Sequence, residues 1–231
     1  MLFHKLLPIT ALLSACMTSA PDDDLLDPQA PVGETVSAVT GVPAFRSLST
    51  YQNGTTVDRP AGLMAGDFML AALEYDADPV SITPPTGWTL RADQISGVGT
   101  PQVFHALVFS HTATASEPAQ YMFDAPSGVF VDITMAAYTG ATAVDQVSGV
   151  GAFTDTILAP NLFTVQPNEL LVSFFVDFDF GSWTVATGET QRSNFDANSL
   201  QDVLIPAVGP TLKHPATCTL SQEAAINVLL K

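Results

Sequence analysis

The sequence contains few cationic side chains. There are 7 Lys and Arg against 23 Asp and Glu in 231 residues, which gives a formal net charge of -16. Proteins that bind nucleic acid gain affinity by releasing phosphate counterions with Lys and Arg. This balance therefore argues against nucleic-acid binding. Only 13% of the residues are charged, roughly half the usual share, and the acidity itself favours solubility rather than any one partner.

Common catalytic motifs are absent from the sequence as well. There is no G-x-S-x-G elbow, H-E-x-x-H, S-x-x-K or glycine-rich phosphate loop. His105 and His111 fall six residues apart in one predicted strand, which separates them by about 20 Å and prevents a shared metal. His214 lies in a predicted loop beside Pro215. Because nothing points to an assembled Ser-His-Asp site, we do not expect an enzyme.

Cysteine is scarce, and one of the two cysteines has a distinctive context. The N-terminus has a weakly basic start with Lys5 and an apolar run at 6–13, which is typical of a signal peptide and too short to span a bilayer. Residues 13–16 read LSAC, which resembles the bacterial lipobox. The resemblance implies that Cys16 is lipidated and becomes the N-acylated first residue. Met17, in place of the Asp that retains many such proteins at the inner membrane, implies an outer-membrane location in the cell envelope. The alternative is an ordinary secretory signal with a chance cysteine.

These features divide the chain into three parts. We expect a lipoprotein signal peptide at 1–15, the lipidated Cys16 with a flexible acidic tether over 16–40, and a folded domain over 41–231. The run Asp22 to Asp24 is interpreted as a solvated spacer rather than a metal site. If Cys16 is lipidated, Cys218 has no intramolecular partner, so we expect a buried free thiol within a strand. Removing the signal peptide also removes Lys5, so the mature charge is 6 − 23 = -17.

Helical periodicity is missing from most of the domain. Short apolar runs alternate with clusters of Gly, Pro, Ser, Thr, Asp and Asn, and there are 17 prolines. This texture predicts an all-β fold, an antiparallel two-sheet β-sandwich of jelly-roll-like form. The C-terminal segment 221–231 would be helical by propensity alone. We predict a strand there because of an internal repeat.

The repeat relates two halves of the domain at an offset of 101 residues. Residues 82–91 read ITPPTGWTLR and residues 183–192 read WTVATGETQR, with five identical positions. The same offset places 67–75 over 168–176, Asp76 and Asp78 over Asp177 and Asp179, and 103–107 over 204–208. After a short deletion, 132–138 falls on 225–231. We predict two related halves that bury a shared core, the alternative being chance similarity between strands.

Six segments of the domain, in order along the chain, carry a family pattern. They are AGDFMLAAL (65–73), ITPPTGWTL (82–90), ATASEPAQYMF (113–123), MAAYTGA (135–141), VDQVSG (144–149) and PNELLVSFF (167–175). With these segments the domain resembles a family of β-sandwich modules found in bacterial secreted and surface proteins and in phage tail-associated proteins. The resemblance implies an extracellular accessory module that is adhesive, glycan-binding or architectural, and it supplies no catalytic residues.

Carboxylates at two predicted strand ends form one candidate site. Calcium prefers six to eight oxygen ligands, and carboxylates two residues apart on a loop can supply several of them. The same groups could serve a glycan hydrolase, which needs two carboxyls about 5 to 10 Å apart. The simpler interpretation is that Asp ends strands by capping turns. The candidate calcium ligands are Glu74, Asp76, Asp78, Asp177 and Asp179.

Aromatic residues beside the repeated turns form the second candidate site. Sugar rings stack on flat aromatic faces, so Trp88, Trp183 and Tyr51 are the candidate glycan contacts. The alternative is that both tryptophans are core residues. The sequence thus predicts a lipid-anchored surface protein with a non-catalytic binding or structural role, whose partner is a glycan or an envelope or surface protein. A carbohydrate-binding lipoprotein and a glycan-active hydrolase are the alternatives.

Overall fold

The computed structural model describes residues 41–231 except residues 79, 80 and 130. The signal peptide, Cys16 and the tether therefore lie outside the described residues. The described part consists of strands and loops. The strands are β1 Ala44–Tyr51, β2 Thr56–Asp58, β3 Phe68–Tyr75, β4 Thr89–Ser96, β5 Phe104–Thr112, β6 Gln120–Met122, β7 Val131–Thr139, β8 Val144–Ala159, β9 Phe163–Thr164, β10 Glu169–Asp177, β11 Thr190–Phe195, β12 Asn198–Ile205, β13 Gly209–Pro210 and β14 His214–Leu230.

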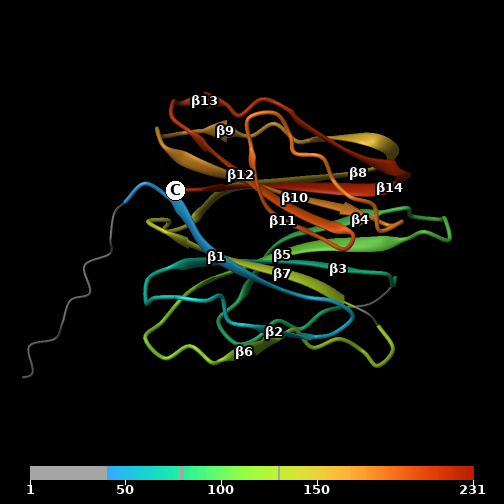
Figure 1. Ribbon diagram of the computed structural model, residues 1–231, viewed down its shortest axis with the longest axis horizontal. Coiled ribbons are helices and arrows are strands. Elements are labelled where there is room, and N and C mark those ends of the chain that lie inside the picture. The colour runs from blue at the N-terminus through green and yellow to red at the C-terminus, as the bar shows by residue number, and fades with distance from the viewer. Residues whose placement is uncertain (1–40, 79–80, 130) are drawn as a thin grey trace, which may run out of the picture. The chain divides into compact units, whose positions relative to one another are not determined.

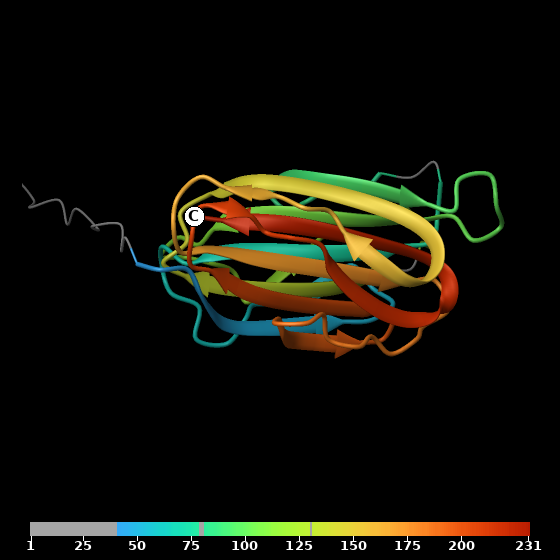
Figure 2. The ribbon, with the colours of Figure 1, turned by 90° about the horizontal axis from the view of Figure 1, so that it is seen from above.

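Two five-stranded antiparallel sheets face each other. The first has the order β1-β7-β3-β5-β4 and the second the order β11-β12-β10-β14-β8. The ribbon β9–β13 lies outside the second sheet and the ribbon β2–β6 outside the first (Figures 1 and 2). The predicted all-β sandwich is confirmed. The C-terminal segment is a strand that pairs with both β10 and β8, so tertiary pairing overrides its local helix propensity.

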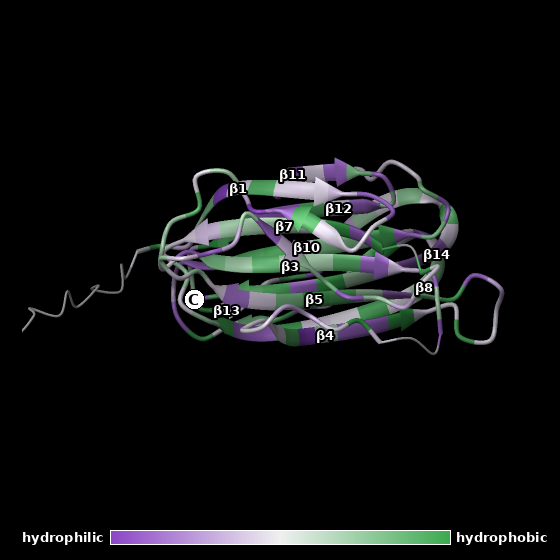
Figure 3. Ribbon diagram, turned by 90° about the horizontal axis from the view of Figure 1, so that it is seen from below, coloured by the Kyte–Doolittle hydropathy of each residue, from purple (hydrophilic) through white to green (hydrophobic). Residues whose placement is uncertain are grey.

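Both faces of the central strands are buried. In β3, Phe68, Leu70 and Ala72 face the second sheet in the shared core. The alternate residues Met69 and Leu73 belong to a separate core beneath the β2–β6 ribbon and its loops. Strands covered on both faces need apolar residues at every position rather than at alternate ones. This explains the continuous apolar run of β3, which Figure 3 shows as a largely green strand.

The repeated turn has the same geometry in both halves. Trp88 N donates to Pro85 O at 3.1 Å, and Glu189 N donates to Ala186 O at 3.0 Å. The glycine before each donor, Gly87 or Gly188, has a φ of 89° or 88°, the left-handed conformation that a type II turn requires at this position. The two sheets also share one strand order, in which β1, β7, β3, β5 and β4 correspond to β8, β14, β10, β12 and β11.

The constant offset of 101 is wrong outside this turn and the strand that follows it. The bulges at Arg91 and Arg192 keep the offset. In β3 and β10, however, the inward-facing Leu70 corresponds to Val172, an offset of 102. A shift of one residue turns every side chain to the other face of a sheet, so the earlier alignment of 67–75 with 168–176 fails by one position.

The remaining aligned segments need corrections of the same kind. Asp177 corresponds to Tyr75 under the offset of 102, so the predicted equivalence of Asp76 with Asp177 does not hold. Phe68 pairs with Thr112 and Leu170 pairs with Leu204, so β5 and β12 differ by 92 residues rather than 101. Phe68 also pairs with Tyr138 and Leu170 with Leu230, so β7 and β14 differ by 92 rather than 93. The duplication is real in topology, and its two halves differ in loop length.

Candidate functional site

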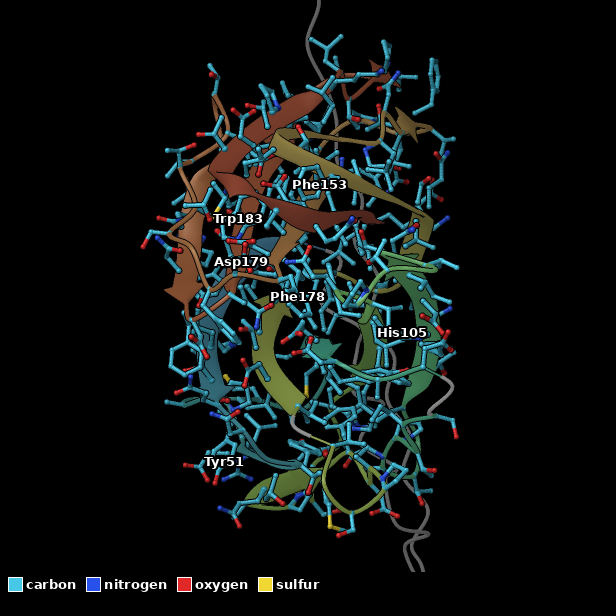
Figure 4. All side chains as sticks on the ribbon, turned by 90° about the vertical axis from the view of Figure 1, so that its right-hand side faces the viewer. Tyr51, His105, Phe153, Phe178, Asp179 and Trp183 are labelled. Atoms are coloured by element: carbon cyan, nitrogen blue, oxygen red, sulfur yellow. The ribbon has the colours of Figure 1, made fainter. Side chains whose placement is uncertain are left out.

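The sandwich has two chemically different ends. We call the end that holds Gly41 and Lys231 the Gly41 end, because residues lining one depression there include both. We call the opposite end, where β1, β3 and β10 finish, the far end. Figure 4 looks onto the far end. All five predicted carboxylate ligands lie there, on two different sheets.

Four carboxyl groups meet where the two sheets open at the far end. Burial and a hydrogen bond with Asp76 raise the pKa of Glu74 well above its ordinary value. Burial raises the pKa of Asp132 to about 6, with a contribution from Asp196. Asn53 N donates to Asp132 at 2.8 Å, and the Gln52 amide donates to Asp196. Two of these carboxyl groups, those of Asp132 and Asp196, were not among the predicted ligands, because their proximity arises from pairing between distant segments.

Asp177 and Glu223 pair across β10 and β14 and are buried on the outer face of the second sheet. Asp177 accepts hydrogen bonds from Gly181 N at 2.8 Å, Asp179 N at 3.0 Å, Cys218 Sγ at 2.9 Å and Thr219 Oγ1 at 3.2 Å, and also from the Ser221 hydroxyl. Burial opposes ionisation, but these donors outweigh it and lower the pKa of Asp177. Its oxygens therefore anchor the bend of β14.

The predicted carboxylates do not converge on a metal. Within residues 41–231, apart from the three omitted positions, no group of three or more His, Cys, Asp or Glu has an arrangement that could hold a metal ion. Asp177 is already occupied by protein donors, and Asp78 Oδ1 faces His105 Nε2 at 3.8 Å. We expect the protein to have the same melting temperature in excess chelator as in millimolar calcium. A calcium-dependent rise would restore the site predicted from the sequence.

Cys218 lies within β14, as predicted, but its thiol is only partly buried. It is a free cysteine in the described part of the chain. Burial and the adjacent Asp177 carboxylate raise the pKa of Cys218 to about 12. A thiol with this pKa is a poor nucleophile at neutral pH. Cys218 is therefore a hydrogen-bond donor in the fold rather than a reactive group.

The two tryptophans are packing residues. Trp88 is 7% exposed and lies against His111, Tyr121 and Phe123 at ring-centroid distances of 5.3 to 5.4 Å. Trp183 is 3% exposed, and its Nε1 donates to Ala197 O at 2.9 Å. Neither indole face is open to a sugar ring, so neither Trp88 nor Trp183 can be the glycan contact predicted from the sequence.

Three exposed aromatic rings lie at the far end. Tyr51 is 47% exposed at the end of β1, and Phe153 is 59% exposed (Figure 4). Phe180, in the loop after β10, is 57% exposed. Sequence reasoning missed both phenylalanines because apolar aromatics in short runs resemble core residues. Phe180 has a φ of 57°, a left-handed conformation that is unfavourable for a bulky side chain.

Within residues 41–231, each of the three histidines has a carboxylate neighbour, and none is hydrogen-bonded to a hydroxyl nucleophile. His105 lies 2.7 Å from Asp93 and stacks on Tyr75, and His111 lies 3.0 Å from Glu117. One cluster over the second sheet does contain the three residue types of a catalytic triad, Ser, Glu and His. Ser173 Oγ donates to Glu189 at 2.9 Å, and His214 Nδ1 lies 2.9 Å from the same oxygen. The carboxylate stands between hydroxyl and imidazole, so His214 cannot accept the serine proton as a catalytic base.

His214 is instead expected to make stability depend on pH. The hydrogen bond to Glu189 raises the pKa of His214 despite its burial, and Nε2 contacts Thr211 O at 2.7 Å. A histidine whose pKa is raised on folding contributes stability below its unfolded pKa of about 6.5 and loses it as pH rises through the folded pKa. We expect His214→Gln to cost about 1.5 kcal/mol at pH 5.5 and clearly less at pH 9.

Urea unfolding at the two pH values measures this difference. Ser173→Ala is the matched control, because it removes a neutral donor from the same carboxylate and should cost the same at both pH values. Equal costs of His214→Gln at pH 5.5 and pH 9 would contradict a charged imidazole in the folded protein.

No helix that is long and apolar enough to cross a membrane occurs in the described residues. Comparison of the chain with protein-family models, with curated proteins and with solved structures gave no match.

Proposed function

We propose that the protein is a lipid-anchored protein of the bacterial cell envelope whose β-sandwich has a non-catalytic binding or structural role. The observation that carries the proposal is the LSAC sequence at 13–16, placed directly after an apolar run of signal-peptide length. Acyl chains at Cys16 would hold the protein on a membrane through hydrophobic burial of about 0.8 kcal/mol per CH₂.

The chemistry of the domain favours a non-catalytic role. His111, His214 and Asp177 make contacts that hold loops to the sheets. The Cys218 thiol donates to Asp177. A glycan hydrolase needs two carboxyls about 5 to 10 Å apart. Glu74 shares a hydrogen bond with Asp76, and Asp132 shares one with Asp196. Each of these four carboxyls is thus engaged with a neighbouring carboxyl, which supports a structural role for the cluster.

Acylation is tested by growing bacteria that produce the full chain with an alkyne fatty acid. We expect the label on the wild-type protein and on Cys218→Ala, and its complete loss in Cys16→Ala. Fractionation of the same cells should place the wild-type protein in the outer-membrane fraction. Equal labelling of Cys16→Ala, or no labelling of any variant, would overturn the anchor.

Carbohydrate binding is the second candidate, and the exposed rings of the far end favour it. Tyr51 and Phe153 lie on the same end as the exposed carboxylate Asp179 (Figure 4). Phe180 follows Asp179 in the chain, and the exposed Asp76 follows the last residue of β3 at this end. This combination suits stacking on sugars and hydrogen bonding to their hydroxyls. A glycan array probed with the full chain tests this candidate, with Phe180→Ala and the Gly41-end variant Phe163→Ala as a matched pair. Retention that only Phe180→Ala abolishes would support binding, and shortening of the glycan would support the hydrolase.

A further inference from the structure

Exposed apolar side chains gather at the Gly41 end and on the neighbouring β9–β13 ribbon. We call them the apolar patch. Each is between 40% and 66% exposed. The members are Val42, Phe163, Val165, Leu204, Val208 and Leu212.

Strand pairing, hydrogen bonds and shared depressions connect most of this patch. Phe163 pairs with Pro210 across the ribbon. Thr164 Oγ1 donates to Ala207 O and accepts from Gly209 N. These bonds connect the neighbour of Val165 to both neighbours of Val208. Gln146 at the start of β8 holds the backbone of Phe163 through both its N and O atoms. Val42 shares one depression with Gln166 and another with Leu204. The ribbon is therefore fixed to the sheet beside the position where residue 41 begins the domain.

Cationic and acidic side chains are distributed differently between the two ends. All six Lys and Arg of the described part lie in the half nearer the Gly41 end. Their ion pairs there join Arg46 to Asp67, Arg192 to Asp202 and Lys231 to Asp145. The far end holds ten of the 18 acidic residues of the described part, and the other eight share the rest of the domain with the six cations. The ten are Glu74, Asp76, Asp78, Asp93, Asp132, Asp155, Asp177, Asp179, Asp196 and Glu223.

We infer that the Gly41 end lies on the surface of a phospholipid bilayer, with the apolar patch in the headgroup region and the far end directed away from it. The inference rests on the lipid anchor proposed above. Negative lipid headgroups repel a cluster of carboxylates and tolerate a surface where cations neutralise them. Apolar side chains gain by partial burial at the boundary between headgroups and acyl chains.

The chain outside the described residues favours a lipid surface over another partner. Residues 17–40 connect Cys16 to Gly41, a length of at most about 85 Å when fully extended. Anchoring therefore limits the distance of the Gly41 end from the bilayer to this length. A tether gives the apolar patch a high effective concentration at the bilayer surface. Even a small patch can therefore bind the lipid.

Depth-dependent fluorescence quenching tests this orientation. Acylated full-length protein is reconstituted into phosphatidylethanolamine–phosphatidylglycerol vesicles with or without brominated acyl chains. The native tryptophans are buried, so an added tryptophan reports its own position. Val165→Trp lies in the patch. Val98→Trp, in the far-end loop between β4 and β5 where Val98 is 71% exposed, is the matched control.

We expect brominated lipid to reduce the added emission of Val165→Trp by about twofold or more and to leave that of Val98→Trp unchanged. Adding Val208→Asp to the first variant should abolish the quenching, while circular dichroism confirms the fold. Equal quenching at both positions, or none at Val165, would overturn the orientation, and none at Val165 would leave a protein partner as the occupant of the patch. Flotation of the vesicles scores the anchor separately, because a protein that fails to float lacks the anchor itself.

Discussion

Replacing Asp177 with alanine is expected to lower the free energy of unfolding by about 4 kcal/mol, because hydrogen bonds to a buried charge contribute strongly and their donors would be left unpaired. Asp177 has no exposed surface and accepts bonds from two backbone amides, two hydroxyls and one thiol. Those donors hold the 178–181 loop to the bulge of β14. Loss of the carboxylate removes the acceptor of the Gly181 amide hydrogen bond.

Urea unfolding of Asp177→Ala and Asp179→Ala separates this role from general charge removal. Asp179 is two residues away and exposed, so its replacement should change stability by less than about 0.5 kcal/mol. Iodoacetamide should also modify Cys218 faster in Asp177→Ala, because the adjacent carboxylate helps to raise the pKa of that thiol. A cost similar to that of Asp179→Ala would show that water replaces the carboxylate without strain.

Glu223→Gln is expected to stabilise the protein by about 3 kcal/mol at pH 7 and to have little effect at pH 4. Glu223 pairs directly with Asp177 across β14 and β10, is fully buried, and neither of its carboxyl oxygens has a hydrogen-bond partner. Burial, followed by the charges of Asp177 and Asp155, raises the pKa of Glu223 to about 8. The folded protein therefore holds a proton on Glu223 that the unfolded chain releases near pH 4.5.

The direction of the pH effect follows from that proton. Between about pH 4.5 and pH 8 the folded state binds more protons than the unfolded state, so stability falls as pH rises through this window. Glutamine has the same shape and no ionisation, and it avoids this loss. Unfolding free energies of wild type and Glu223→Gln at pH 4, 5.5, 7 and 8.5 give the two slopes. Parallel curves would show that Glu223 ionises normally in the folded protein.

The sequence was most informative where backbone conformation dictates residue type. Gly87 and Gly188 identified a repeated turn because a type II turn requires positive φ at that position. The C-terminal strand was predicted from its alignment with 132–138, even though that alignment was one residue out of register. Such an error preserves the type of element and reverses which face is buried. The fold class was therefore accessible, while the burial of individual residues was not.

The candidate site shows the same limit at single positions. Trp88 and Glu189 occupy equivalent places in the repeated turn. The first packs against Tyr121 and Phe123, whereas the second bonds to Ser173 and His214. Identical turn geometry thus presents an aromatic ring to one outer layer and a carboxylate to the other. The difference comes from loops that cover each sheet, and their positions depend on long-range packing that a local pattern does not encode.

The division of strands between the sheets has a consequence for synthesis of the chain. All five strands of the first sheet come from residues 44–139, and all five of the second from residues 144–230. Each sheet can therefore complete its own backbone pairing without the other half. Because synthesis starts at the N-terminus, the strands of the first sheet are made before those of the second. The inner face of the first sheet then remains uncovered, including Phe68, Leu70, Phe104 and Tyr138. The order of synthesis thus produces a partly folded chain with an exposed apolar face, which is prone to aggregate. We expect a chaperone to be needed most before β10 and β14 have been synthesised.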